Sequence, residues 1–373
     1  MSVCIVEVKN KCQLRKFILW PETLYKDCPN WVPPLVGDEF DTLDPRKNAA
    51  FDFCEAKLYL AYEDNRIVGR VAGIINHKAN EIWKENVVRF GWFDFIESVE
   101  VAKALTDAVA QWGKAHGCTL IKGPLGFTDM DKEGLLVEGY ENLSPFTCLY
   151  NYPYYDRILN EIGFAKDADW TQRIFTVTPE LPANFSFSED ITARFGLHML
   201  KARSTRELGR KYGLEIFHLC NESFSKLYEF TPLTDKQIKR YLQTYVAILD
   251  PKFVAVCLNA EEKPVGFAFC VPSLSKAVKK HNGRLLPFGF IDLLKALRHN
   301  DTLEALMIGV LPEYQGKGAV LLMLKYIHES CVKMGIDKVI MNPQLETNIK
   351  VQTLFEDYNP LPYMRRRSYV KSL

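Results

Sequence analysis

The segment from Leu303 to Leu324 constrains the fold of this chain most, because an apolar strand leads through a glycine-bearing turn directly into an apolar helix. Gly316 and Gly318 lack Cβ atoms, so a ligand can approach the backbone of the turn closely. The first turn of the helix that follows has unpaired N–H groups at the positive end of the helix dipole. This arrangement predicts a binding site for an anion such as a diphosphate.

The spacing of these glycines separates the turn from two other phosphate-binding motifs. A P-loop requires Gly-x-x-x-x-Gly-Lys-Ser/Thr, and a dinucleotide-binding turn requires a third glycine with an acidic residue about 20 positions further on. Neither pattern is present in this segment. The alternative interpretation is an ordinary connection between a strand and a helix, with two incidental glycines.

The turn resembles motif A of the GNAT superfamily of N-acetyltransferases, through Gln315-Gly-Lys-Gly-Ala319 after Val310-Leu-Pro-Glu313. In that superfamily the motif binds the pyrophosphate of acyl-coenzyme A. The resemblance implies acetyl-coenzyme A or a longer acyl-coenzyme A as cosubstrate, held at the diphosphate by the turn and at the pantetheine by the preceding strand edge. Asn348 matches a superfamily asparagine that contacts the coenzyme, although an N-cap asparagine is the alternative. The implied binding residues are Ile308, Val310, Gln315, Gly316, Lys317, Gly318, Ala319, Val320 and Asn348.

The second half of the chain shows the complete element order of a GNAT domain. A helical region from Lys226 to Leu249, with a capping box at Thr234-Asp-Lys-Gln237, precedes it. The expected elements are strands at 253–258, 265–271 and 303–311, a helix at 318–334, a strand at 338–342, a helix at 348–358 and a strand at 363–371.

The first half repeats this order less clearly. The segment Phe90 to Glu97 stands where the pyrophosphate turn is expected and carries one glycine, so we expect no ordinary coenzyme site there. The expected elements are strands at 57–63 and 66–76, a helix at 99–116, a strand at 118–123, a helix at 154–164 and a strand at 170–177.

With 373 residues, these patterns predict two domains and an α/β fold, in the form of an α+β mixed sheet. Each of the two tandem GNAT-like domains is expected to be a mixed, mostly antiparallel sheet flanked by helices. The first, residues 1–180, is degenerate and lacks the pyrophosphate turn, and the second, residues 191–373, holds the acyl-coenzyme A site. Thr178 to Asp190 is the expected linker. The chain also resembles bacterial tandem GNAT-like proteins through Asp44-Pro-Arg-Lys-Asn48 and Lys122-Gly-Pro-Leu-Gly126, and some of those proteins are linked to N-acylation of sphingoid bases.

The composition limits which partners, cellular location and metal content can be expected. The chain has 47% hydrophobic and 25% charged residues and a formal net charge of +1, which gives no indication of a nucleic-acid partner. No apolar run is long enough to span a bilayer and the start does not read as a signal peptide, so a cytoplasmic protein is expected. The ten cysteines and seven histidines lack zinc-ligand spacing, so no metal is expected.

Acyl transfer to an amine requires a base for the ammonium proton and an acid for the departing thiolate. Glu304, near the start of the strand that leads to the acyl site, is the first candidate for the base, and a solvated edge glutamate is the alternative. Glu346 is the second candidate, and there the alternative is a charge that complements a helix dipole. Many GNAT proteins have a tyrosine as acid where this chain has Phe355, so Tyr358, almost one helical turn on, is the candidate. A buried core tyrosine, with solvent as the proton source, is the alternative.

An insertion from Pro272 to Thr302 carries the apolar stretch from Leu285 to Leu297 between basic residues. It could line an acyl tunnel or touch a membrane surface peripherally, and the alternative is a helix that packs against the protein itself. The expected acceptor is a lipidic amine such as a sphingoid base, or else a small amine. A third possibility is a catalytically silent acyl-coenzyme A binding protein. The oligomeric state does not follow from the sequence.

Overall fold

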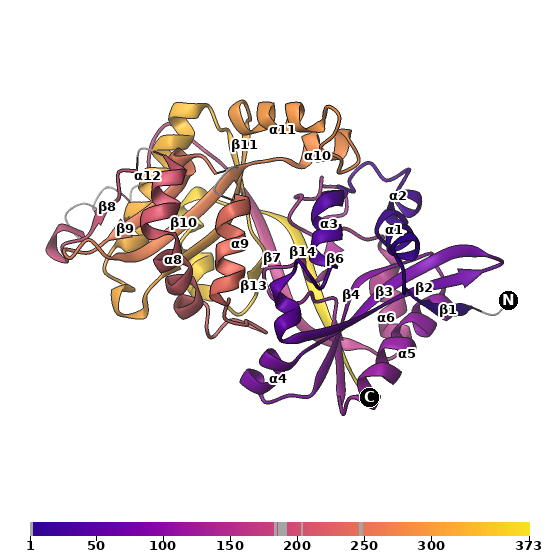
Figure 1. Ribbon diagram of the computed structural model, residues 1–373. Coiled ribbons are helices and arrows are strands. Elements are labelled where there is room, and N and C mark those ends of the chain that lie inside the picture. The colour runs from indigo at the N-terminus through magenta and orange to yellow at the C-terminus, as the bar shows by residue number, and fades with distance from the viewer. Residues whose placement is uncertain (1–2, 183–184, 186–191, 203, 246–248) are drawn as a thin grey trace. The chain divides into compact units, whose positions relative to one another are not determined.

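The computed structural model describes residues 3–182, 185, 192–202, 204–245 and 249–373 (Figure 1). The chain forms two compact units, each drawn from more than one segment: unit 1 from Met1–Thr171, Leu274–Leu293 and Met364–Leu373, and unit 2 from Gln172–Ser273 and Leu294–Tyr363. The predicted domains, residues 1–180 and 191–373, remain a proposal. They describe a duplication in the sequence, whereas the two units are defined by which residues pack together. Most of the predicted linker Thr178 to Asp190 lies outside the described residues.

Unit 1 is built on a sheet with the strand order β1-β2-β3-β4-β5-β14, and β6 also pairs with β14. All these pairs are antiparallel except β4 with β5, which is parallel. The strands are β1 (Cys4–Glu7), β2 (Cys54–Glu63), β3 (Arg66–Asn76), β4 (Val87–Phe95), β5 (Leu120–Gly123), β6 (Leu135–Glu138) and β14 (Leu361–Ser372). The helices are α1 (Lys11–Leu19), α2 (Pro21–Leu24), α3 (Val36–Thr42), η1 (Ala49–Asp52), α4 (His77–Trp83), α5 (Val99–Ala115), α6 (Tyr154–Glu161) and α10 (Ser275–Lys280).

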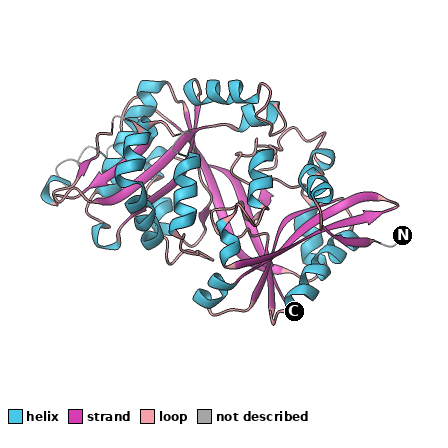
Figure 2. Cartoon of the chain, in the orientation of Figure 1, coloured by secondary structure: helices cyan, strands magenta, loops and turns pink. Residues whose placement is uncertain are grey.

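Helices cover both faces of the unit 1 sheet, as the cyan helices against the magenta strands in Figure 2 show. On one face α5 packs its apolar side, including Leu105 and Val109, onto the sheet. Its close approach depends on Gly69, where an added Cβ would lie 2.7 Å from the Cδ1 atom of Leu105. On the other face α1 contributes Phe17 and Ile18 to a second apolar cluster.

Unit 2 is built on a sheet with the strand order β7-β12-β11-β10-β9-β8. The pairs are again antiparallel except one, β11 with β12. The strands are β7 (Ala165–Thr176, whose first seven residues belong to unit 1), β8 (His198–Met199), β9 (Val254–Leu258), β10 (Pro264–Pro272), β11 (Thr302–Val310), β12 (Lys338–Met341) and β13 (Gln344–Leu345). The helices are α8 (Thr205–Ser223), α9 (Asp235–Tyr245), η3 (Pro251–Phe253), α11 (Gly289–Arg298, whose first five residues belong to unit 1), η4 (Pro312–Tyr314), α12 (Ala319–Met334), α13 (Ile349–Thr353) and η5 (Glu356–Tyr358).

The unit 2 sheet lies between α12 and α8. Apolar residues of α12, among them Met323 and Ile327, form one cluster with the sheet. Residues of α8, among them Ile216 and Leu219, form another with Phe267 and its neighbours. The predicted fold class, mixed and mostly antiparallel sheets flanked by helices, is therefore confirmed.

The region Lys226 to Leu249 is helical in part: α9 begins at Asp235, within the predicted capping box, in which Thr234 and Gln237 bond each other reciprocally. Two predicted elements were wrong. The predicted helix at 348–358 is two short pieces, α13 and η5. The segment Phe90 to Glu97, expected as a turn, is mostly the buried strand β4, because Phe90, Phe93 and Phe95 belong to an apolar core.

The last strand of each predicted repeat belongs to the sheet of the opposite unit. Ile174, Phe175 and Thr176 of β7 pair with β12 in unit 2. The end of β14, from Tyr369 to Ser372, pairs with β5 in unit 1. The sequence predicts both strands at these places, but it assigns each to its own half.

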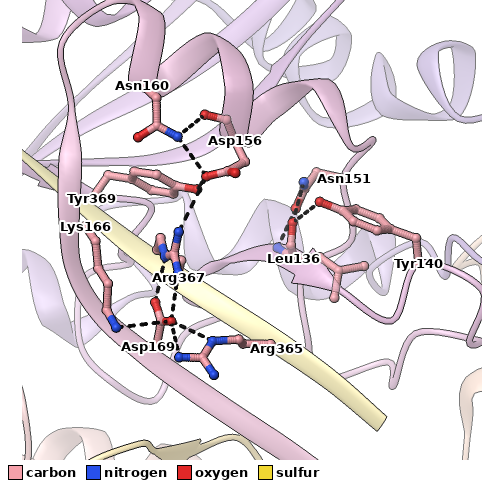
Figure 3. A network of polar contacts seen from close by, with 10 residues as sticks. All are labelled: Leu136, Tyr140, Asn151, Asp156, Asn160, Lys166, Asp169, Arg365, Arg367 and Tyr369. Carbon is pink, nitrogen blue, oxygen red and sulfur yellow. Dashed lines mark hydrogen bonds and ion pairs between the residues drawn. The ribbon is translucent and has the colours of Figure 1, made fainter. Parts of the chain in front are cut away.

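A polar network holds the end of β14 in unit 1, with Asp169 at its centre (Figure 3). The Asp169 side chain has no exposed surface and accepts hydrogen bonds from Arg365 Nε at 2.6 Å and from Arg367 Nε at 2.8 Å. Lys166 Nζ lies 3.3 Å from the same carboxylate, and the Tyr369 hydroxyl donates to Asp156. Burial alone raises the pKa of Asp169, but the hydrogen bonds and charges of Arg367 and Arg365 outweigh it and lower the pKa. The basic and aromatic alternation of this strand therefore serves to pair it with unit 1.

Candidate functional site

The glycine turn stands between β11 and α12, as the sequence predicts. Gly316 has φ 75° and Gly318 has φ 84°, a left-handed conformation that favours glycine. An added Cβ on Gly316 would meet no atom within 4 Å, so the space beside the turn is open on that side. The turn thus exposes its backbone to an incoming ligand.

Among the described residues, no side chain caps the N-terminus of α12. Gly318 is the N-cap residue, and the first turn contains no acidic residue. The N–H groups of the first helical residues remain as donors, since the first helical bond runs from Leu322 N to Gly318 O at 3.0 Å. Lys317 adds a positive charge, with its Nζ atom 5.1 Å from the ring centre of Tyr314 and 5.5 Å from that of Phe195. Backbone donors, helix dipole and ammonium group together suit a diphosphate.

Of the remaining predicted binding residues, Gln315 is exposed and Val320 half-buried, whereas Ala319 is buried in the apolar cluster under α12. The side chain of Gln315 donates to the carbonyl oxygen of Val310 at 3.4 Å. Any contact of these three residues with a diphosphate would therefore come chiefly from their backbone.

Strand β11 separates from its parallel neighbour at the end that leads to this turn. Its pairing with β12 runs only from Thr302 to Ala305, whereas its pairing with β10 continues to Val310. A bulge interrupts the second ladder, so that Leu306 has no partner in the β10–β11 register. Ile308 and Val310, the residues predicted to hold the pantetheine, lie in the stretch that β12 no longer pairs.

Glu304 lies at the beginning of the same strand and is buried, with 3% of its surface exposed. Leu303 joins the cluster under α12, so the alternation of a strand directs Glu304 to the face that α8 covers. The Ser273 hydroxyl donates to Glu304 Oε1 at 2.6 Å, and Asn300 Nδ2 donates to the Ser273 carbonyl oxygen at 2.7 Å. A solvated edge glutamate, the alternative from the sequence, does not describe this residue.

Glu346 and Asn348 flank the start of α13. Gln352 Nε2 donates to the carbonyl oxygens of Leu345 at 3.0 Å and Glu346 at 3.3 Å, which fixes this loop against the helix. Asn348 is the N-cap residue of α13, but its side chain makes no capping hydrogen bond. The capping interpretation therefore does not account for the Asn348 side chain.

Tyr358 is partly buried and packs against the core of unit 2. Its ring centre is 4.4 Å from that of Phe175, and its hydroxyl oxygen is 3.2 Å from His328 Nδ1. Burial raises the pKa of the Tyr358 hydroxyl, which makes it a poorer proton donor, and burial also lowers the pKa of His328. The helical spacing that placed Tyr358 on the side of Phe355 does not apply, because α13 ends at Thr353.

The corresponding place in unit 1 is filled by the chain. β4 pairs with β5 only from Val87 to Arg89, and beyond it Leu125 N donates to Phe90 O at 2.8 Å. An added Cβ on Gly91 would lie 2.5 Å from the Leu125 carbonyl oxygen. The segment Lys122-Gly-Pro-Leu-Gly126 thus covers the end of β4. The equivalent end of β11 in unit 2 is left unpaired by β12.

The helix after β4 also differs from α12. Ser98 caps α5, its Oγ atom accepting from Val101 N at 3.2 Å, and Glu100 places a negative charge in the first turn. A diphosphate at the start of α5 would find one N–H donor already bonded to Ser98, and the negative charge of Glu100 would repel it. The expectation that the first half holds no ordinary coenzyme site has a physical basis in these contacts.

Sequence reasoning missed Ser273 and His328, the partners of two predicted residues. Ser273 lies 31 positions from Glu304, and His328 lies 30 positions from Tyr358. Only the strand pairing of β10 with β11 could have indicated Ser273, since Pro272 pairs with Leu303 beside it.

Within the residues that the structure describes, no group of His, Cys, Asp and Glu side chains is arranged to hold a metal ion. No helix in the described ranges is both long enough and apolar enough to cross a bilayer.

The chain is similar to two bacterial proteins over nearly its whole length. It is 27% identical over 379 residues to Protein YghO of Escherichia coli (strain K12), covering 98% of this chain and 94% of that protein. It is 25% identical over 384 residues to the Bacterial ceramide synthase of Caulobacter vibrioides (strain NA1000 / CB15N), covering 100% of this chain and 98% of that protein. No protein-family model matches the chain.

Solved structures match the fold at low sequence identity. A tandem GNAT protein from the clavulanic acid biosynthesis pathway has a TM-score of 0.55 at 12% identity and covers 100% of this chain and 98% of its own. A GCN5-related N-acetyltransferase from Sphaerobacter thermophilus has a TM-score of 0.51 at 12% identity, with 99% and 95% covered. The chain therefore has the fold of the tandem GNAT proteins.

Proposed function

We propose that this protein is an acyl-coenzyme A dependent N-acyltransferase, with its coenzyme site at the N-terminus of α12. The observation that carries the proposal is the uncapped helix start behind Gly316 and Gly318, directly after a strand that has parted from its parallel neighbour. The equivalent helix in unit 1 is capped by Ser98, so one chain offers one such site among its described residues.

The chemistry assigned to the site is attack of an amine nitrogen on the thioester carbonyl. A C–N bond forms, the C–S bond breaks, and coenzyme A leaves as a thiolate. The backbone of the turn and the edge of β11 hold the donor in place, and a main-chain N–H near the bulge at Leu306 is suited to stabilise the oxyanion.

Glu304 is the proposed base. It accepts the proton that the ammonium group must lose before the nitrogen can attack. Ser273 positions it, because the hydrogen bond of 2.6 Å fixes one carboxylate oxygen. Glu346 is the second choice, on the loop that Gln352 holds. Water is the proposed proton source for the thiolate.

The proposed acceptor is a lipidic amine such as a sphingoid base. This rests on the similarity to the ceramide synthase of Caulobacter vibrioides, since a ceramide is the N-acyl derivative of such a base. A small amine is the alternative acceptor. The donor is acetyl-coenzyme A or a longer acyl-coenzyme A, and no metal is required for this reaction.

One observation favours a second function, that of an acyl-coenzyme A binding protein without turnover. The hydroxyl of Tyr358 is engaged with His328 and its ring packs against that of Phe175 at a tilt of 31°, so it is poorly placed to serve as the acid. This function predicts coenzyme binding without release of a thiol.

The test is a screen for amine-dependent release of the coenzyme A thiol. Acetyl- and long-chain acyl-coenzyme A are each offered with sphingoid bases and with small amines, and the free thiol is titrated. Gly316→Glu is the control that removes donor binding, and Glu304→Gln is the control that keeps it. The proposal is abandoned if the protein binds coenzyme A but no amine releases thiol above the level of Gly316→Glu.

A further inference from the structure

The insertion between β10 and β11 exposes an unusual number of large apolar side chains. Within ten residues, 285 to 294, six of them have 40% or more of their surface exposed. They are Leu285 (43%), Leu286 (77%), Phe288 (65%), Phe290 (43%), Ile291 (40%) and Leu294 (47%). The alternative interpretation, a helix that packs against the protein itself, therefore does not describe these side chains. We call these six residues the apolar patch.

Hydrogen bonds at the start of the insertion hold the segment that carries the patch in place. Lys279 Nζ donates to the carbonyl oxygens of Cys28 at 3.3 Å and Trp31 at 3.2 Å, and the Gly283 carbonyl oxygen accepts from Val36 N at 2.9 Å. The Ser275 hydroxyl accepts from Phe146 N at 2.9 Å. These contacts lie within unit 1 and fix α10 and the turn after it, so the patch stands on an ordered support.

Helix α11 is tied to α10 through one carboxylate. Asp292 Oδ2 lies 2.7 Å from Lys280 Nζ and 2.7 Å from His281 Nε2. With 3.6 residues per turn, the opposite face of α11 carries Phe290, Ile291 and Leu294. The half-buried side of α11 thus carries Asp292 together with Leu293, Ala296 and Leu297, and the more exposed apolar side chains lie on the other side of the helix.

Positive charge surrounds the patch. Residues 274 to 300 contain six Lys or Arg residues and a single Asp, although the whole chain has a formal net charge of only +1. Two of the six are ion-paired, Lys280 with Asp292 and Arg284 with Glu22. Lys276, Lys295 and Arg298 are exposed, and the last two extend the outward face of α11 beyond Leu294. Exposed aromatic and aliphatic side chains with a cationic border match the interface of a bilayer that contains anionic lipid.

We infer that the apolar patch, with its basic border, docks the protein on the surface of an anionic lipid bilayer. Leu286, Phe288 and Phe290 enter the boundary between headgroups and acyl chains, and the basic residues contact lipid phosphates. A second copy of this chain is a poor occupant, because a two-fold interface would bring the basic borders of both copies together. The inference does not depend on the proposed enzymatic activity.

The test is flotation of the purified full-length protein with vesicles of phosphatidylcholine alone and of phosphatidylcholine mixed with phosphatidylglycerol. We expect binding to the mixed vesicles that weakens as salt is raised. Leu286→Ser with Phe288→Ser should weaken this binding about tenfold or more, since one deeply inserted large apolar side chain is equivalent to roughly a tenfold change. Lys295→Glu with Arg298→Glu should abolish the preference for the anionic vesicles.

The matched control is Ile82→Ser with Leu361→Ser, which removes apolar side chains of similar exposure (43% and 66%) outside the patch. It should bind vesicles as the parent protein does, and both double serine variants should keep the parent's melting temperature. Two results overturn the inference: vesicle binding that is absent or equal in the patch and control variants, or a dimer in light scattering that the patch variant dissolves.

Discussion

Replacement of Gly316 gives the sharpest test of how the turn works. Gly316 has φ 75°, and an added Cβ would touch nothing within 4 Å. Alanine and glutamate there both adopt a left-handed conformation, at a cost of about 1–2 kcal/mol. We therefore expect both variants to lose stability alike, with a melting temperature lower by about 2–8 °C for a unit of this size.

Only the glutamate places a negative charge beside the diphosphate. Two like charges about 4 Å apart repel by about 1 kcal/mol in water and about 4 kcal/mol at the effective dielectric of a protein surface. Relative to Gly316→Ala, Gly316→Glu should therefore bind coenzyme A more weakly by about 5-fold to about 1,000-fold.

The assay is a competition titration of coenzyme A against a fluorescent coenzyme analogue, with a thermal melt of each variant. If Gly316→Glu binds coenzyme A as tightly as Gly316→Ala, the diphosphate does not lie at the turn. A loss of affinity that is equal in both variants would assign the effect to backbone strain and not to charge.

Two further changes test other parts of the structure. Glu304→Gln should keep coenzyme A affinity while turnover falls, and the deficit should shrink as pH rises and more of the amine is already neutral; steady-state rates across pH measure this, and equal activity in the variant would move the role of base to Glu346. Asp169→Asn removes the charge that Arg365 and Arg367 contact, and should cost about 3 kcal/mol in urea unfolding near neutral pH. Because the folded-state pKa of Asp169 is lowered from 3.8, its stabilising effect is present above that pH and is lost as pH falls through the lowered value. The stability difference between Asp169→Asn and the parent should therefore shrink in acid, and a difference that is constant with pH would contradict the role given to this carboxylate.

The fold follows from the sequence where the pattern is local. The glycines at 316, 318 and 335 adopt the positive φ angles that mark the start and the end of α12, and the Asp64-Asn65 turn joins β2 to β3. The sequence does not predict that β7 and β14 are exchanged between the units. Both strands show the same alternation of side chains, and this alternation does not determine which sheet edge a strand pairs with.

The geometry of the glycine turn follows from the sequence, whereas the surroundings of the candidate acid and base do not. A turn and a helix start are consecutive in sequence, whereas the surroundings of Glu304 and Tyr358 come from residues about 30 positions away. The position of Tyr358 was inferred from an unbroken helix, and that helix ends at Thr353. The outward face of α11 also needed the structure, since an amphipathic pattern does not tell which side meets the protein.

The central claim is that one coenzyme site exists per chain and that it lies at the start of α12. Calorimetric titration of the full-length protein with coenzyme A tests it most directly. The account predicts one site per chain, abolished or strongly weakened in Gly316→Glu and unchanged in Ser98→Ala, which uncaps α5. Two equal sites, or no binding at all, would contradict it.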